Sequence, residues 1–510
     1  RLDREVRIEN SSRRGGLLEI DFLAVVGGDT ATGYGLGQPE MKFSGPDEAE
    51  HFTRQLYTSL YFMRNYMIDA KGNAFRSLPG GVSEKASPTD YALLLNELAS
   101  WGSLPEAKKM VGNVPPLMGR RISHQNLELT AAQPLLVLGV YNAWRKNGRP
   151  KEMLSRLWSP CVSSPINQII KVAEAHPVGL VNARGEFGAE NPELEGYTRP
   201  VASAVSAAIN AAIEMAYDSD RGIQATTWRR SLDTFDKNIR RNFAAQDGGT
   251  DINSTTIYPA AYGLPSIATI TTEIPQDVWL YGWYEDGSPV CYSGDVRVFD
   301  TPYLFSGEAF RTYRTGFTIN DKRKLQAMQK TFDHMLANSL VFSNASWHHS
   351  TVMTYKSTDL HLWTTLAALM LDNREWAKKA LHGFIRYTYD EGIIPRVSGE
   401  RVAECEISPF TFEERLNVSS VGVNLGPSGD DLNIPTAVGA MQVARAMAGI
   451  DDHNVRLLRL EPRLPIDNSK DDNDWTKVEV SDWMISHDFE DAKALPINFY
   501  SFEKLKDSSY

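Results

Sequence analysis

Two segments of the chain concentrate acidic side chains, and the first of them adds a tyrosine and an arginine. Residues 185–199 contain four glutamates and end in Tyr197 and Arg199, and residues 396–431 carry a second group of acidic residues. Hydrolysis of a glycosidic bond needs two carboxyl groups that flank the bond, one of them protonated as a general acid. The two segments can supply both groups, although each carboxylate can equally be an ordinary solvated loop residue.

Aromatic residues in other long loops give a second indication of a carbohydrate ligand. Trp283 and Trp347 can stack on the apolar face of a sugar, and His348 and His349 follow Trp347 directly. Each ring can instead cover the core. A metal at the two histidines is not expected, because adjacent histidines rarely reach one ion and no acidic ligand stands at helical spacing. We expect no metal and no cofactor.

Composition excludes several classes of protein. The 510 residues are 42% hydrophobic and 23% charged, with a net charge of −11 and 3 cysteines. The high apolar content excludes a disordered protein. The negative net charge argues against a nucleic-acid-binding protein, because binding to phosphates needs a basic surface. Three scattered cysteines are too few for a disulfide framework. No uncharged apolar run reaches membrane-spanning length. The low cysteine content, abundant Trp and Tyr, and four glycosylation sequons are compatible with a secreted or periplasmic protein.

The elements that must position these residues are mainly helices. Apolar residues at helical spacing predict helices from residue 44 onward. About twelve are expected. They include Tyr91–Trp101, Leu104–Val111, Leu127–Asn147, Pro150–Glu174, Thr198–Tyr217, Ala225–Phe243, Pro302–Arg314, Asp321–Leu340, Thr358–Leu371, Asn373–Tyr389 and Asp431–Ala448.

The helices alternate in character along the chain. Within each pair the first helix is apolar nearly all round and the second has a charged stripe, as in 202–212 followed by 228–241. A helix that is apolar all round is buried, whereas one with a charged stripe faces water. Two concentric rings follow, which is an all-α-dominated fold, an (α/α)6 toroid. Links from outer to inner helices are long, so the long loops gather at one end of the barrel, over the N-termini of the inner helices.

Short strand patterns flank the helical region. We expect an N-terminal β segment over 1–44, the catalytic toroid over 45–450 and a C-terminal β appendage over 451–510. The segment around Asp286-Gly287 is typical of a β-hairpin.

The layout resembles the six-hairpin glycosidase superfamily. The likeness covers residues 45–465 and includes the approach to a buried helix at Pro177–Phe187 and the closing strand Leu460–Pro465. The resemblance implies a general acid in the loop that enters the third inner helix, and a base in the loop that enters the last. The acid candidates are Glu195, Glu190 and Glu186, and the base candidates are Asp430 and Asp431.

The expected function is therefore that of a glycoside hydrolase with an inverting mechanism, since acid and base come from separate hairpins and leave room for a water. Asp430 and Asp431 can alternatively be helix N-caps. Tyr197, Arg199, Trp283, Trp347, His348 and His349 are the expected substrate-binding residues.

Two other functions stay open. A polysaccharide lyase would use Tyr or His as the base beside a uronate, with Arg neutralising its carboxylate. A non-catalytic glycan-binding toroid would keep the aromatic rings without needing the acids. The acidic loop favours a neutral sugar and hence hydrolysis, because it would repel a polyuronate.

Overall fold

The structure is a computed structural model of the 510-residue chain. It describes residues 40–78, 82–118, 129–130, 132–176, 178–181, 183–184, 195–243, 282–284, 355–389, 415–417, 427–428, 433–454, 457–465, 474–485 and 495–503.

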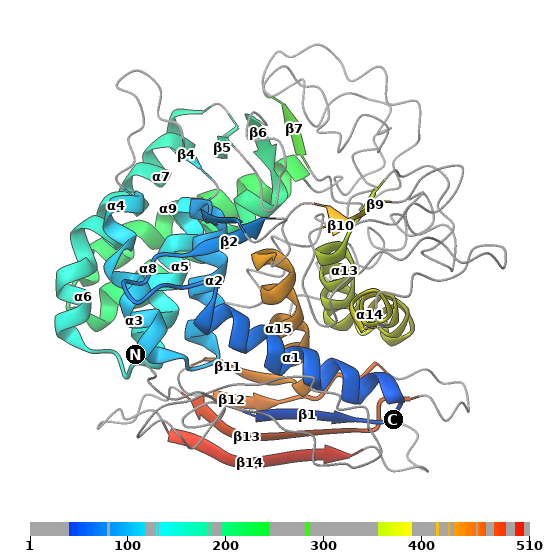
Figure 1. The fold of residues 1–510 in the computed structure, drawn as a ribbon. Coiled ribbons are helices and arrows are strands. Elements are labelled where there is room, and N and C mark those ends of the chain that lie inside the picture. The colour runs from blue at the N-terminus through cyan, green and yellow to red at the C-terminus, as the bar shows by residue number, and fades with distance from the viewer. Residues whose placement is uncertain are drawn as a thin grey trace, which may run out of the picture.

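Helices dominate the described part of the chain (Figure 1). They are α1 (Asp47–Asn65), α2 (Pro88–Ser100), α3 (Leu104–Gly112), α4 (Val114–Met118), α5 (Ala132–Lys146), α6 (Lys151–Leu157), the π-helix η2 (Trp158–Ser163), α7 (Ser164–Ala175), α8 (Arg199–Asp218), α9 (Gly222–Phe243), α13 (Thr358–Met370), α14 (Arg374–Tyr389) and α15 (Ile434–Ala448).

The strands are short except near the C-terminus. They are β1 (Glu40–Ser44), β2 (Phe75–Leu78), β3 (Val82–Lys85), β4 (Leu129–Thr130), β5 (Ala183–Arg184), β6 (Glu195–Thr198), β7 (Gly282–Tyr284), β8 (Tyr355–Ser357), β9 (Arg415–Asn417), β10 (Pro427–Ser428), β11 (Ile450–Asn454), β12 (Leu457–Leu460), β13 (Lys477–Ile485) and β14 (Leu495–Glu503).

Five of the described helices form an inner wall. They pack side by side in the order α13, α15, α2, α5, α8. Every residue of α5 and α15 is buried, which is the behaviour expected of helices that are apolar all round. The close approach of α2 and α5 has a local cause: Gly139 faces Leu95, and a Cβ at that glycine would lie 2.8 Å from Leu95 Cδ2.

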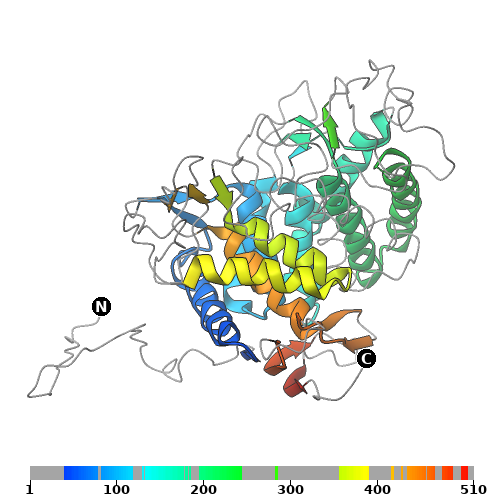
Figure 2. The same ribbon diagram turned by 90° about the vertical axis from the view of Figure 1, so that its right-hand side faces the viewer.

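The remaining helices cover this wall from outside. The helix α9 packs on α8, α14 packs on α13, and α1 lies against α15 and α14 (Figure 2). Their surfaces are amphipathic, as α9 shows: Trp228 is buried beside the exposed Arg229 and Arg230. The expected helix 150–174 is interrupted by η2, where Ser164 N–H donates to Ser159 O and prolines 160 and 165 supply no N–H donor.

Links at the two ends of the helices differ in length. The turns from inner to outer helices are short, and each contains a residue in the left-handed region, for example Asp220 (φ 59°) after α8 and Asp372 (φ 57°) after α13. Outer-to-inner links are long and contain the short strands β2 to β10. We call the end with these strands the open end and the opposite end the closed end.

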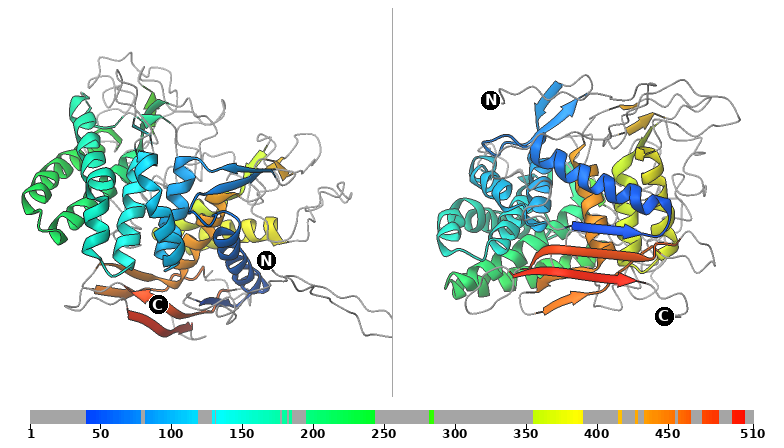
Figure 3. Two further views of the ribbon diagram at one scale, coloured as in Figure 1. Left: turned by 60° about the vertical axis from the view of Figure 1, so that its left-hand side comes forward. Right: turned by 60° about the horizontal axis from the view of Figure 1, so that its bottom comes forward.

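A three-stranded antiparallel sheet, in the order β1–β13–β14, covers the closed end (Figure 3). Its buried Trp483 packs edge-on against Trp101 at the end of α2, with the ring centroids 5.4 Å apart. Trp475, just before β13, makes similar contacts with Phe43 of β1 and Phe52 of α1, both at 5.9 Å. The first and last described strands therefore belong to one sheet.

Buried charges lie behind this sheet. Glu97 of α2 accepts hydrogen bonds from Arg445 Nε of α15 at 2.9 Å and from Trp101 Nε1 at 2.8 Å. Arg445 Nη2 adds a contact of 3.1 Å to the other carboxylate oxygen. The ammonium of the buried Lys146 lies 5.0 Å from the centre of the Trp483 ring. The closed end is therefore held by a bidentate ion pair and a cation–π contact.

The sequence prediction of an α/α toroid is confirmed, together with the alternation of inner and outer helices in the described chain. The expected helices 302–314 and 321–340 and the hairpin turn at 286–287 lie outside the described residues. None of the described helices has the length and apolarity to cross a bilayer. The domain boundaries and the secreted or periplasmic location stay predictions.

Candidate active site

The open end carries three small sheets at the N-termini of inner helices (Figure 1). The hairpin β2–β3 precedes α2, and the sheet β4–β5–β6–β7 precedes α5 and α8. The sheet β10–β9–β8 precedes α13 and α15. The loops in which the sequence places its candidate residues therefore start from short, hydrogen-bonded strands.

Strand β6 contains two of the predicted site residues, Glu195 and Tyr197. It pairs antiparallel with β7, so that Tyr197 lies opposite Trp283. Residues opposite each other in a ladder share a face of the sheet, and residues two apart along a strand share it as well. One face of the sheet therefore carries the positions of Glu195, Tyr197 and Trp283. The pairing of Tyr197 with Trp283 brings together two segments that are 86 residues apart in the sequence.

Arg184 is a position that the sequence reasoning missed. It lies in the two-residue strand β5, opposite Glu195 of β6 and opposite Thr130 of β4. Arg184 is therefore on the same face as the three predicted residues. A two-residue strand has no periodicity to detect, so only the pairing reveals this neighbour.

The predicted binding residue Arg199 is the first residue of α8, which begins directly after β6. The first turn of a helix exposes backbone N–H groups and the positive end of its dipole. The sheet face with Glu195 and Tyr197 therefore leads into a helix terminus that favours oxygen-rich or anionic groups.

The second acidic loop enters α15. The prediction that this helix begins at Asp431 is wrong: it begins at Ile434, because Asn433 is its N-cap and accepts a bond from Thr436 N at 2.9 Å. Pro435 in the first turn suits this start. Asp430 and Asp431 lie in the sequence between β10 and Asn433, outside the described residues, and neither is the cap of α15.

The other predicted residues also lie outside the described part of the chain. These are Glu186, Glu190, Trp347, His348 and His349. Within the described residues, no group of three or more His, Cys, Asp or Glu side chains could hold a metal ion.

One open-end loop is held by a network around Asp69. Its carboxylate accepts bonds from Lys71 N at 2.8 Å, Asn73 N at 2.9 Å and Asn73 Nδ2 at 2.8 Å. These donors, the Asn73 side chain above all, lower the pKa of the Asp69 carboxyl. The hydroxyl of Tyr91, in the first turn of α2, lies 2.8 Å from Gly72 O and so ties the loop to the inner wall.

No protein-family model matches the chain, and no curated protein sequence matches it. Solved structures with a similar fold were found. A GH78 family rhamnosidase of a Bacillus species has a TM-score of 0.50 at 11% identity, over 87% of this chain and 39% of the other.

Two further similar structures have lower scores. An unsaturated glucuronyl hydrolase specific for heparin has a TM-score of 0.44 at 12% identity, over 78% of this chain and 96% of the other. A cellobiose 2-epimerase from Bacillus thermoamylovorans has a TM-score of 0.46 at 9% identity, over 78% of this chain and 97% of the other.

At such identities the likeness concerns the fold alone. It agrees with the ring of inner helices, the covering outer helices and the loops gathered at one end. The fold of this chain is an α/α toroid, and the GH78 family rhamnosidase is a solved structure with a similar fold.

Proposed function

We propose that the chain is a carbohydrate-active enzyme that hydrolyses a glycosidic bond at the open end of the toroid. The observation that carries the proposal is the strand register, which gives a carboxylate and two aromatic residues neighbouring positions on one sheet face: Glu195, Tyr197 and Trp283. A carboxyl group beside aromatic surfaces is the combination that sugar hydrolysis needs, because the rings bind the sugar and the acid protonates the leaving oxygen. The shared fold of sugar-active enzymes supports the proposal.

In the proposed reaction, a glutamate of the 185–195 segment is the general acid and Asp430 or Asp431 is the general base. Glu195 is the first choice for the acid, with Glu190 and Glu186 as alternatives. The base would activate a water on the opposite side of the sugar ring and so invert the anomeric centre. Acid and base would come from the loops that enter the third and the last inner helix, which is compatible with a water between them.

Arg184 favours a second candidate function, elimination on a uronate. In that reaction Tyr197 would remove the proton beside the carboxylate, and Arg184 would neutralise the carboxylate.

A panel of neutral and uronate polysaccharides tests the two candidates. Hydrolysis releases reducing ends without ultraviolet absorbance, whereas elimination produces unsaturated ends that absorb. An Arg184→Ala variant sharpens the result: it should lose at least about a hundredfold in turnover if Arg184 neutralises the carboxylate in an elimination. An increase in ultraviolet absorbance would overturn the proposal of hydrolysis. If no glycan gave any product, the proposal of an enzyme would be overturned in favour of a non-catalytic glycan-binding protein.

A further inference from the structure

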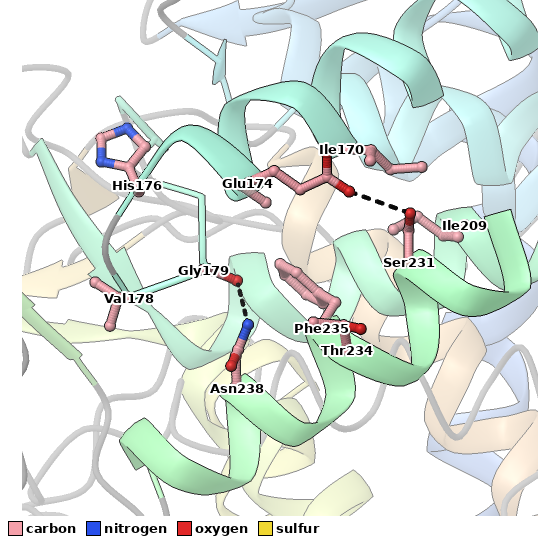
Figure 4. Close-up of a pocket in the computed structure, with 11 residues that line it drawn as sticks. Ile170, Glu174, His176, Val178, Gly179, Ile209, Ser231, Thr234, Phe235 and Asn238 are labelled. Carbon is pink, nitrogen blue, oxygen red and sulfur yellow. Dashed lines mark hydrogen bonds between the residues drawn. The ribbon is translucent and has the colours of Figure 1, made fainter. Parts of the chain in front are cut away.

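A pocket of about 240 Å³ lies in the outer wall of the toroid, between the outer helices α7 and α9 (Figure 4). The inner helix α8 contributes Ile209 to its floor, and the turn at Val178 and Gly179, just after α7, closes one side. Both outer helices run toward the open end, and none of the residues that line the pocket is a proposed catalytic residue.

The lining divides into an apolar floor and a polar rim. The floor consists of Ile170, Ala173, Val178, Ile209 and Phe235. Four of these five side chains are at most 5% exposed, so the floor is part of the core.

The rim consists of Glu174, His176, Ser231, Thr234 and Asn238. It offers a carboxylate, an imidazole, two hydroxyls and an amide, and the described lining includes neither Lys nor Arg.

Hydrogen bonds between the walls preform this rim. Ser231 Oγ donates to Glu174 Oε1 at 3.3 Å, and Asn238 Nδ2 donates to Gly179 O at 3.2 Å. Gly179 has a φ of 66°, and a Cβ there would lie 2.1 Å from Asn238 Nδ2. A larger residue here would be strained at this φ and would displace the Asn238 amide, so glycine allows the hydrogen bond between the walls. A preformed rim binds a ligand with less loss of conformational entropy.

We propose that this pocket binds a single neutral sugar ring of a glycan, at a site separate from the catalytic one. A pyranose has an apolar face of C–H groups, which suits the floor, and a periphery of hydroxyls, which suits the donors and acceptors of the rim. The volume is below the range of about 300–1,000 Å³ typical of drug-sized ligands, so one ring rather than a chain is expected. The Glu174 carboxylate, without a lining cation, disfavours uronates.

Calorimetric titration of the full chain with neutral oligosaccharides and with oligouronates tests the proposal. The variant Ser231→Phe places a ring in the pocket, and Thr227→Phe, at an exposed position four residues earlier on α9, is the matched control. We expect Ser231→Phe to lose one binding site, or at least tenfold in affinity, and the control to bind neutral glycans like the unmodified chain. Turnover of short soluble substrates should not change in either variant.

A second variant guards against misfolding. Glu174→Ala changes an exposed rim residue and should weaken binding several-fold without altering the helical circular dichroism. Unchanged binding in both pocket variants, absence of neutral-glycan binding, or equal affinity for oligouronates would each overturn the proposal. Because calorimetry measures binding directly, the proposal for the pocket can be contradicted while catalysis is observed. Equally, the pocket can bind a glycan when no catalysis is observed.

Discussion

The closed and open ends of the toroid use charged and aromatic residues in different ways. At the closed end, Glu97, Arg445 and Trp101 are buried and bonded to one another across two inner helices. At the open end, Glu195 and Tyr197 stand on a four-residue strand whose partners have two and three residues. The first arrangement joins helices, and the second gathers loop residues on a sheet face.

This contrast shows that a perturbed carboxyl group is not by itself a catalytic one. Burial raises the pKa of the Glu97 carboxyl, and the Arg445 guanidinium opposes that effect. Perturbed acids often mark active sites, although structural ion pairs perturb them as well. Glu97 lies near the end of α2 and is 0% exposed, and Trp101 beside it packs against Trp483 of the terminal sheet. Position in the fold separates the two roles.

The largest expected effect is on stability, at the closed end. Glu97→Leu alone should lower the free energy of unfolding by about 3–5 kcal/mol, because it removes the carboxylate that accepts two hydrogen bonds from the buried Arg445 guanidinium. The double variant Glu97→Leu/Arg445→Met should recover most of that loss. Denaturant unfolding measures both.

The exposed pair Arg54–Glu50 on α1 is the control for this ion pair, with side chains 47% and 69% exposed. Glu50→Ala should cost no more than about 1 kcal/mol. Equal effects at the two sites would show that burial does not set the strength of the Glu97 pair.

The next effect concerns activity, at the open end. Glu195→Gln should lower kcat by at least about two orders of magnitude, the usual scale for loss of a general acid, with an unchanged melting temperature. Steady-state kinetics on the substrate found with the panel measures it. A fully active variant would move the acid to Glu186 or Glu190, and full activity in all three glutamine variants would remove this loop from the chemistry.

A smaller effect is expected between the two ends, where α2 and α5 touch. Gly139→Ala would push against the buried Leu95, and overpacking of this kind costs about 1–3 kcal/mol, partly offset by better helix propensity. Gly112→Ala, at the end of α3, meets nothing within 4 Å and should stabilise by up to about 1 kcal/mol. Thermal melts of the pair should shift in opposite directions; a shared direction would contradict close packing at Gly139.

The smallest effect concerns pH, in the loop of Asp69. The folded-state pKa of Asp69 lies below its ordinary value of 3.8, so its bonds stabilise the protein above that pH and are lost as pH falls through the folded pKa. At pH 7 the Asp69→Asn variant should therefore melt at a slightly lower temperature than the unmodified chain. The loss in the free energy of unfolding should be less than about 1 kcal/mol. The difference in melting temperature between the two proteins should shrink below about pH 4. A difference that does not change with pH would show that the charge of Asp69 does not cause the effect.

Much of the fold could be predicted from sequence, because the inner helices are long and apolar all round. The helix 198–217, for instance, differs by one residue at each end from α8 (Arg199–Asp218). The start of α15 was misplaced, since Asp431 and Asn433 are both good capping residues and sequence alone does not choose between them. The pairing of Tyr197 with Trp283 was out of reach, because long-range register depends on tertiary structure and strands this short carry no pattern.

The sheet at the closed end has a consequence for how the protein is made. Ser44 O accepts a bond from Thr476 Oγ1, 432 residues later in the chain. A ribosome adds about 5–20 residues per second, so β1 leaves it about 20 to 90 seconds before its partner β13 exists. Throughout that interval α1 also lacks α14 and α15, on which it packs. The contacts of β1 and α1 with these late segments can thus form only after nearly all of the chain has been synthesised.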